Sequence, residues 1–220
     1  MSVFTSVRGN KMVKGIIFDF DGVIVESEPL FLDSIILYLR KFNIETDYKD
    51  LSYLLGMSME DIVIELKRKY QITDDLDTIN REATEIYNDI KTLDRFSLIT
   101  GVEDFMKKCQ SKQIKMCVAS SSAMDYLLEL IKHFNIEQYF QFVLTGDDFE
   151  KSKPDPQIYN TAAEKLGIDK KELIVVEDAY NGILAAKRAN IYTYGLKASV
   201  INQNTSCADK QIYSYSEIDL

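Results

Sequence analysis

Short apolar runs alternate along this chain with longer segments in which apolar residues recur every three or four positions. The short runs are rich in β-branched residues and predict strands at 14–20, 114–120, 141–145, 173–177 and 191–196, with a weaker one at 211–215. The periodic segments predict helices at 102–111, 123–134, 156–166 and 180–189. Several of the strands are apolar almost throughout, as strands covered on both faces are. The pattern therefore predicts an α/β fold, a Rossmann-like doubly wound parallel sheet with crossover helices.

The segment 27–97 follows a different pattern, because it contains no convincing strand and its apolar residues keep helical spacing. Ser27 suits the cap of a first helix, with Pro29 in its first turn. About seventy helical residues between the first and second strands predict an inserted all-helical cap domain. We expect hinges near 23–28 and 97–102. The predicted domains are a core of residues 12–26 and 98–220, a cap of residues 27–97, and a loose N-terminal extension of residues 1–11.

Composition narrows the classes of function. The 220 residues are 46% hydrophobic, but no apolar run approaches the ~20 residues that span a bilayer. The first eleven residues lack the apolar stretch of a secretion signal. The net charge of −9 argues against broad binding to nucleic acid or an anionic membrane, yet it permits a small phosphorylated ligand in a local cleft. We expect a monomer.

The cysteines bear on the cellular location of the protein, and the single histidine argues against two classes of active site. Three cysteines without paired spacing indicate reduced thiols and a cytoplasmic protein. His133 lies in a predicted helix, and a catalytic or metal-binding histidine would usually need partner residues that the sequence does not single out, so we interpret it as structural. Hydrolases of the Ser-His-Asp type and histidine-built zinc sites are thereby disfavoured.

Polar side chains follow four of the predicted strands, where the ligands of an open parallel sheet bind. These side chains are Asp19 and Asp21, Ser120 to Ser122, Lys153, and Glu177 with Asp178. Four carboxylates and a lysine are unfavourable in a packed core, because burying like charges costs free energy. They suit Mg²⁺, which takes one or two carboxylates together with phosphate oxygens and water. Because the chain has no GxxxxGK[ST] loop, a Walker-type phosphate site is excluded.

Some of these positions have alternative interpretations. The hydroxyl of Ser120 suits the cap of the following helix as well as a phosphate site. Lys151 is a rival to Lys153, although the Lys-Pro-x-Pro context favours the latter. Glu177 is as suited to supporting a metal ligand through a hydrogen bond as to binding the metal itself.

The apolar run that ends in Asp19-Phe20-Asp21-Gly22 resembles motif I of the haloacid dehalogenase (HAD) superfamily, and the serine, lysine and acid pair match its other motifs in order. The resemblance covers residue 14 to the end of the chain. It implies that Asp19 is a nucleophile forming an aspartyl-phosphate and that Asp21 is the general acid/base. It implies that the phosphoryl group is held by Ser120, Ser121 and Lys153. It further implies a Mg²⁺ cofactor bound by Asp19, the backbone carbonyl of Asp21, Asp178 and Glu177.

The position of the helical insertion resembles subfamily I, which includes phosphatases, β-phosphoglucomutases, phosphonatases and dehalogenases. Asp21 disfavours dehalogenation, and no cap lysine stands out for the Schiff base of a phosphonatase. A β-phosphoglucomutase has a histidine and a cap-loop arginine where this chain has Phe31 and Met59. Without that arginine a second phosphate would be held poorly, so hydrolysis is the better prediction. The mutase stays open as an alternative, and so does a non-catalytic binding protein, although such proteins usually lose a catalytic acid.

The substrate is predicted only as a class. The segment Val25-Glu26-Ser27-Glu28-Pro29 resembles the D-S-E-P of many sugar-phosphate phosphatases. We therefore expect a phosphatase acting on a small phosphate monoester, specifically a sugar phosphate. Glu26, Met57 and Met59 are candidates for selecting the substrate, with packing of the cap as the alternative interpretation.

Overall fold

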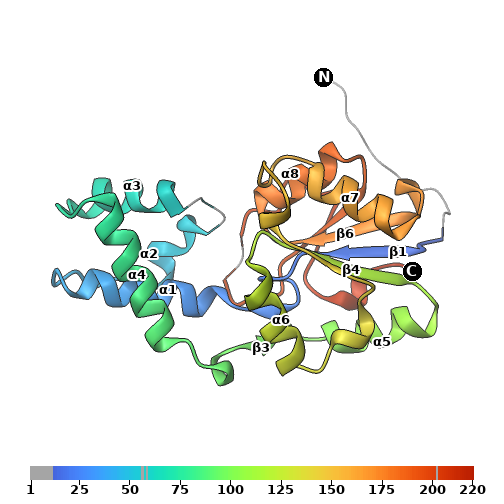
Figure 1. Ribbon diagram of the computed structural model, residues 1–220, viewed down its shortest axis with the longest axis horizontal. Helices are drawn as coiled ribbons and strands as arrows, with labels where there is room; N and C mark the ends of the chain where they lie inside the picture. Colours follow the sequence, from blue (N-terminus) through green and yellow to red (C-terminus); the bar gives the residue numbers. More distant parts are fainter. Residues whose placement is uncertain (1–11, 56, 58, 202) are drawn as a thin grey trace.

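The computed structural model describes residues 12–55, 57, 59–201 and 203–220, so the predicted extension of residues 1–11 lies outside the described residues. Figure 1 shows a sheet covered by helices on both faces and, beside it, a group of helices. The strands are β1 (Gly15–Phe18), β2 (Val25–Glu26), β3 (Ser97–Leu98), β4 (Lys115–Ala119), β5 (Val143–Leu144), β6 (Leu173–Glu177), β7 (Tyr192–Leu196) and β8 (Lys210–Ile212). The helices are α1 (Glu28–Arg40), α2 (Tyr48–Leu51), α3 (Met59–Tyr70), α4 (Leu76–Ile90), α5 (Val102–Ser111), α6 (Met124–His133), α7 (Gln157–Leu166) and α8 (Tyr180–Arg188). Among the described residues, every helix is too short or too polar to cross a membrane.

The main sheet is parallel throughout, in the order β5-β4-β1-β6-β7-β8 within the described residues. The chain runs outward from β1 through β4 and β5, and then crosses to the other side of β1 and continues through β6, β7 and β8. The strand order therefore reverses at β1. In an open parallel sheet, the crevice at such a reversal is where ligands bind.

Two hydrophobic layers explain why the strands are almost continuously apolar. Ile16 and Phe18 of β1 pack with α5 and α6 on one face of the sheet, and Ile17 packs with α7 and α8 on the other. All three side chains are fully buried. The predicted doubly wound fold is confirmed, since helices cover both faces (Figure 1).

The helices α1 to α4 and the turns between them pack around a separate hydrophobic cluster, which includes Leu39, Leu54, Leu66 and Ile79. The chain enters and leaves this group through β2 and β3, which pair antiparallel with Val25 opposite Leu98. This short ribbon lies at the two predicted hinges. The helical content predicted between the first two sheet strands is thus present, and we propose the predicted boundaries at residues 27 and 97 as those of a cap domain.

Most predicted strand bounds differ from the structure by one to three residues, and two differences lie beside the carboxyl end of β1. The first strand ends at Phe18 rather than at residue 20, although the amide of Asp19 still donates to the Val176 carbonyl at 3.0 Å. Ser27 stands directly before α1 but makes no capping hydrogen bond, because its hydroxyl donates to Asp21 instead. As a result, the side chain of Asp19 lies just after β1, and the hydroxyl of Ser27 lies beside Asp21.

Candidate active site

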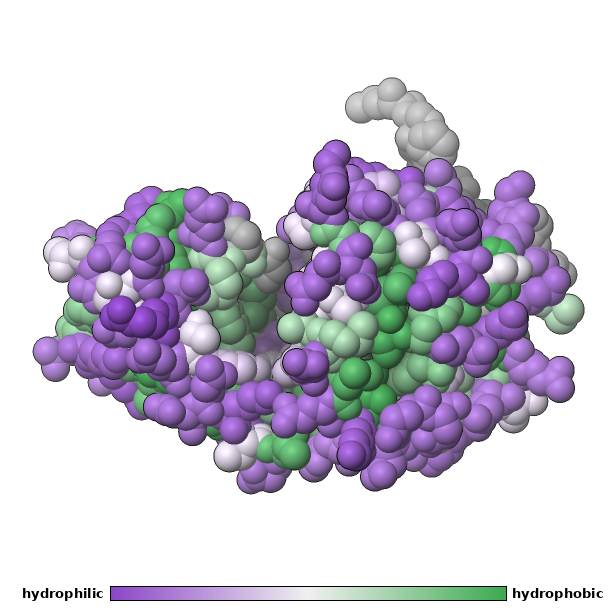
Figure 2. Space-filling model, in the orientation of Figure 1, coloured by the Kyte–Doolittle hydropathy of each residue, from purple (hydrophilic) through white to green (hydrophobic). Residues whose placement is uncertain are grey.

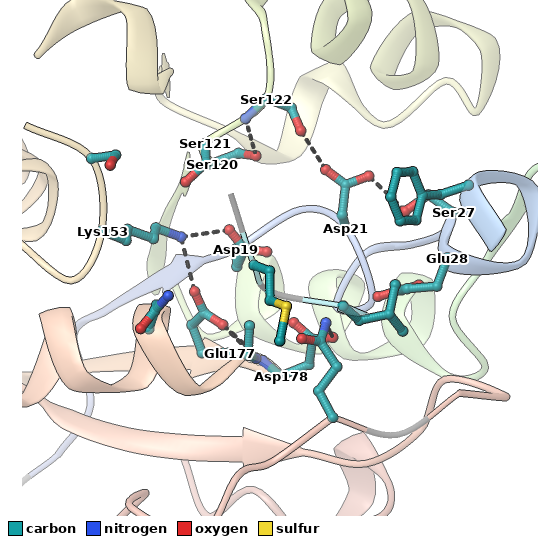
Figure 3. Close-up of a pocket in the computed structure, with 18 of the residues that line it drawn as sticks. Asp19, Asp21, Ser27, Glu28, Ser120, Ser121, Ser122, Lys153, Glu177 and Asp178 are labelled. Atoms are coloured by element: carbon teal, nitrogen blue, oxygen red, sulfur yellow. Dashed lines mark hydrogen bonds and ion pairs between the residues drawn. The ribbon is translucent and has the colours of Figure 1, made fainter. Parts of the chain in front are cut away.

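A cavity of about 860 Å³ lies between the carboxyl ends of the sheet strands and the helices α1 and α3. Figure 2 shows the molecule hollowed between its helical part and its sheet part. The cavity brings together nine of the ten predicted site residues: Asp19, Asp21, Ser120, Ser121, Lys153, Glu177, Asp178 and, from the helical part, Met57 and Met59. Glu26 does not line it. The four separate strand ends of the sequence therefore form one polar surface (Figure 3).

Asp19 and Lys153 form a buried ion pair at the end of β1. Lys153 Nζ lies 2.6 Å from Asp19 Oδ1, and both side chains are largely buried. Burial raises the pKa of Asp19 to about 7, although Lys153 acts in the opposite direction. Burial disfavours the lysine charge as well, but the Asp19 and Glu177 carboxylates raise the pKa of Lys153 well above its ordinary value. The lysine is therefore a fixed positive charge beside Asp19.

Glu177 uses both carboxylate oxygens on protein donors. Its Oε1 accepts from Lys153 Nζ at 2.9 Å and from the Tyr159 hydroxyl at 3.0 Å. Its Oε2 accepts from the backbone amides of Asp178 and Ala179, each at 2.9 Å. A carboxylate with four donors already in place is well suited to holding Lys153. Of the two alternatives left open by the sequence, this arrangement favours support of the site over direct binding of a metal.

Three buried acids bring carboxylate oxygens close together in the cavity. One carboxylate oxygen from each of Asp19, Glu177 and Asp178 lies within 4.8 Å of the other two. Burial raises the pKa of Asp178 well above its ordinary value, and the neighbouring Glu28 and Glu177 add to the shift. Glu28 is itself buried, and its Oε2 has no hydrogen-bond partner. Such crowding of buried oxygen ligands fits a hard divalent cation, which would compensate their charge.

Asp21 points away from Asp19 toward a set of hydroxyl groups (Figure 3). Its Oδ1 accepts from Ser27 at 2.6 Å and from Tyr126 at 2.8 Å, and its Oδ2 accepts from Ser122 at 2.6 Å. Ser27 belongs to the hinge segment, whereas Ser122 and Tyr126 follow β4. The carboxylate is thus held in one orientation by donors from both parts of the molecule.

Ser120 is buried at the end of β4, where its amide donates to the Leu144 carbonyl. Its hydroxyl accepts from the amide of Ser122 at 3.1 Å rather than from the first turn of α6, which begins at Met124. The alternative interpretation of Ser120 as a helix cap is therefore wrong. Ser121 is exposed and lines the cavity beside it.

The family profile of haloacid dehalogenase-like hydrolases matches residues 16–196, which is most of the chain. The chain belongs to the haloacid dehalogenase-like hydrolase family. It is 27% identical over 184 residues to the phosphorylated carbohydrates phosphatase of Thermotoga maritima, covering 81% of this chain and 82% of that one. It is 25% identical over 207 residues to the validoxylamine A 7'-phosphate phosphatase of Streptomyces hygroscopicus subsp. limoneus, covering 94% and 96%. The crystal structure of β-phosphoglucomutase from Clostridium difficile superposes with a TM-score of 0.71 at 25% identity, covering 94% of each chain.

The predicted substrate-selecting residues of this hydrolase lie in two different places. Met57 and Met59 line the cavity and are 42% and 39% exposed. Glu26 instead accepts from the Ser199 hydroxyl at 2.6 Å and from the Val200 amide at 2.9 Å. The carboxylate of Glu26 is therefore occupied by the loop after β7, and its position favours a packing role.

Several residues at the site of this hydrolase could not be identified from the sequence. Tyr126 and Tyr159 lie on helices, where an aromatic residue at helical spacing is ordinarily part of the core. Gln203 lies in a loop without a motif, yet its side chain donates to Asp178 Oδ2 at 2.9 Å. The only sequence signal for Glu28 was its place in the D-S-E-P-like segment. Each of these contacts depends on packing between segments far apart in the chain.

Gly182 in α8 provides a test of how tightly Glu177 is held. An added Cβ at Gly182 would overlap the Glu177 carboxylate. In an ordinary helix interior, alanine is more favourable than glycine by ~1 kcal/mol. We expect the opposite sign for Gly182→Ala, a destabilisation of about 2 kcal/mol or more, because Glu177 must leave its buried donors. Urea unfolding measures the effect, and a variant as stable as the wild type would contradict it.

Stability should depend on pH in a metal-dependent way. Burial raises the pKa of Asp19 to about 7 and that of Glu28 to about 8, from ordinary values near 4. The folded state therefore binds these two protons more tightly than the unfolded chain does. The contribution of the two groups to folding stability is fully present below about pH 4 and is lost as pH rises through about 7 to 8. We expect the stabilisation by Mg²⁺ to grow between about pH 5 and 8, because the ion binds the ionised carboxylates.

Thermal unfolding with Mg²⁺ and with chelator, at several pH values in that range, measures this difference. The shift in melting temperature between the two conditions should widen by a few degrees as pH rises. A shift that stays constant or narrows would contradict the assignment of the buried acids.

Proposed function

We propose that this chain is a Mg²⁺-dependent phosphatase that hydrolyses a small phosphate monoester, specifically a sugar phosphate, through an aspartyl-phosphate on Asp19. The observation that carries the proposal is the buried contact of 2.6 Å between Asp19 and Lys153, in a cavity that Ser120 and the acid cluster also line. Relatives named as phosphatases of phosphorylated carbohydrates and of validoxylamine A 7'-phosphate support the substrate class.

The proposed reaction has two steps: the phosphoryl group is transferred to Asp19 and then from Asp19 to water. Lys153 holds Oδ1 of Asp19, which keeps the carboxylate in place for attack on phosphorus. As the new oxygen–phosphorus bond forms, the bond to the ester oxygen breaks, and Asp21 gives that oxygen its proton. Asp21 then takes a proton from water, which attacks the same phosphorus and releases inorganic phosphate and the Asp19 carboxylate. For these steps the Asp21 carboxyl must exchange at least one of its three hydroxyl partners for the substrate.

The remaining residues position the transferred group. The Ser120 hydroxyl, Ser121 and the Lys153 ammonium are the donors for its peripheral oxygens, and phosphoryl transfer depends mainly on such positioning. Asp19, Asp178 and the backbone carbonyl of Asp21 would hold Mg²⁺, with Glu177 in support. When bound, the ion supplies positive charge that offsets the repulsion between the nucleophile and the phosphate.

The mutase alternative is disfavoured by the side chains around the cavity. Phe31 and Met59 line it at the two positions where a mutase would carry histidine and arginine. Neither side chain offers a charge or a hydrogen bond to a second phosphate. A monophosphorylated substrate with one apolar contact surface fits these residues better than a bisphosphorylated intermediate.

Phosphate release from a panel of phosphate monoesters, with Mg²⁺ and with chelator, tests the proposal. We expect chelator-sensitive release, fastest with sugar phosphates. Conversion of β-glucose 1-phosphate to glucose 6-phosphate without net release of phosphate would favour the mutase. Absence of both reactions, with every ester of the panel, would favour a non-catalytic binding protein.

A further inference from the structure

The loop after β7 connects the sheet part of the molecule to the hinge. The hydroxyl of Ser199 and the amide of Val200 both donate to the Glu26 carboxylate, at 2.6 and 2.9 Å. Glu26 belongs to β2, half of the ribbon through which the chain enters the helical group. A carboxylate with one donor on each oxygen fixes the loop against this ribbon.

The same loop also reaches the hydrophobic cluster of α1 to α4. Ile201 is 6% exposed and packs into that cluster, although it comes from the sheet part of the chain. Its amide donates to the Ser199 hydroxyl at 3.1 Å, which ties the apolar anchor to the anchor on Glu26. Residues 199–201 therefore have a defined position relative to both parts of the molecule.

Gln203 extends from these anchors into the cavity. Its Nε2 donates to Asp178 Oδ2 at 2.9 Å, and Gln203 is among the residues that line the cavity. One carboxyl oxygen of Asp178 lies within 4.8 Å of an oxygen of Asp19 and of an oxygen of Glu177, and the carboxyl group of Glu28 is also a neighbour. An amide donor on Oδ2 restricts rotation of the Asp178 carboxyl group and so fixes the orientation of its oxygens beside the acid cluster.

We propose that Gln203 is a positioning residue for Asp178, held in place by the contacts of Ser199, Val200 and Ile201 with the hinge and the helical cluster. This inference rests on the proposed function, because it takes Asp178 as a ligand of Mg²⁺. Hydrogen-bond partners that orient a metal ligand typically change metal affinity by about 10- to 100-fold. The amide of Gln203 thus contributes to the affinity for Mg²⁺ without contacting the ion.

Calorimetric titration of the full chain with Mg²⁺, in the absence of substrate, tests the proposal. Gln203→Met keeps the length of the side chain and removes the donor, and we expect its Mg²⁺ affinity to fall by about 10-fold. Gln203→Asn keeps an amide on a shorter side chain and should show an intermediate affinity. Val200→Ala is the matched control, because this neighbouring side chain is 73% exposed and should leave the affinity unchanged.

A kinetic measurement separates positioning from contact with the substrate. The Mg²⁺ concentration for half-maximal phosphate release should rise by about 10-fold in Gln203→Met, and saturating Mg²⁺ should recover the lost activity. Equal Mg²⁺ affinities of wild type and Gln203→Met would overturn the inference alone. A wild-type protein that binds no Mg²⁺ would overturn the proposed function and this inference with it. Circular dichroism of both Gln203 variants identifies any variant that has failed to fold.

Discussion

Asp19→Asn should reduce phosphate release by about 10³-fold or more, whichever phosphate ester is used, because the variant lacks the nucleophile. An amide of the same size occupies the same volume, so the fold should persist. Lys153 loses its contact of 2.6 Å with a carboxylate but keeps Glu177 and the Ala119 carbonyl as acceptors. The measurement is phosphate release at saturating Mg²⁺, compared with the wild type at the same protein concentration.

Asp147→Asn is the matched control for this experiment. Asp147 also follows a sheet strand, but it is exposed and its amide donates to the Thr145 hydroxyl in a local turn. Its activity should equal that of the wild type. If Asp19→Asn kept more than a few per cent of the wild-type rate, another group would have to be the nucleophile.

Lys153→Met should cost about 3 kcal/mol or more of folding stability and most of the activity. The ammonium group lies within 3.0 Å of three buried acceptors, on Asp19, Ala119 and Glu177. Removing one member of a buried ion cluster leaves its partners as uncompensated charges, which typically costs 3–5 kcal/mol. The loss should be greater at higher pH, where Asp19 cannot be neutralised by protonation. Chemical unfolding at two pH values measures both effects.

Lys151→Met provides the comparison for Lys153→Met, since Lys151 is exposed two residues earlier in the same loop. A surface lysine contributes little, so this variant should keep its stability within about 0.5 kcal/mol. It also tests the rival position that the sequence left open. Equal losses of activity in the two variants would contradict the assignment of Lys153.

The sequence predicted the fold class and, for the most fully buried strand, its bounds. The strand predicted at 173–177 has those bounds in the structure, because every residue in it is buried on one face or the other. The first strand was predicted to run two residues too far at its carboxyl end, since Phe20 continues the apolar pattern after the regular pairing of β1 has ended at Phe18. An alternating pattern shows which side chains are buried, but not where the backbone stops pairing.

The candidate site was predictable only in part for a related physical reason. Residues at strand ends, such as Asp19 and Lys153, converge because parallel strands share an edge. Glu26 was a candidate for selecting the substrate, but the loop after β7 binds its carboxylate. Neither that contact nor the one between Gln203 and Asp178 follows from periodicity, because both join segments more than twenty residues apart in the chain.

Detection of the covalent intermediate tests the central claim most directly. The wild-type protein would be mixed with a phosphate ester carrying a labelled phosphoryl group, quenched in acid within milliseconds, and digested into peptides. We predict a hydroxylamine-sensitive label on the peptide that contains Asp19, present with Mg²⁺ and absent from Asp19→Asn. Label on a different residue, or rapid phosphate release without any label on that peptide, would contradict the account.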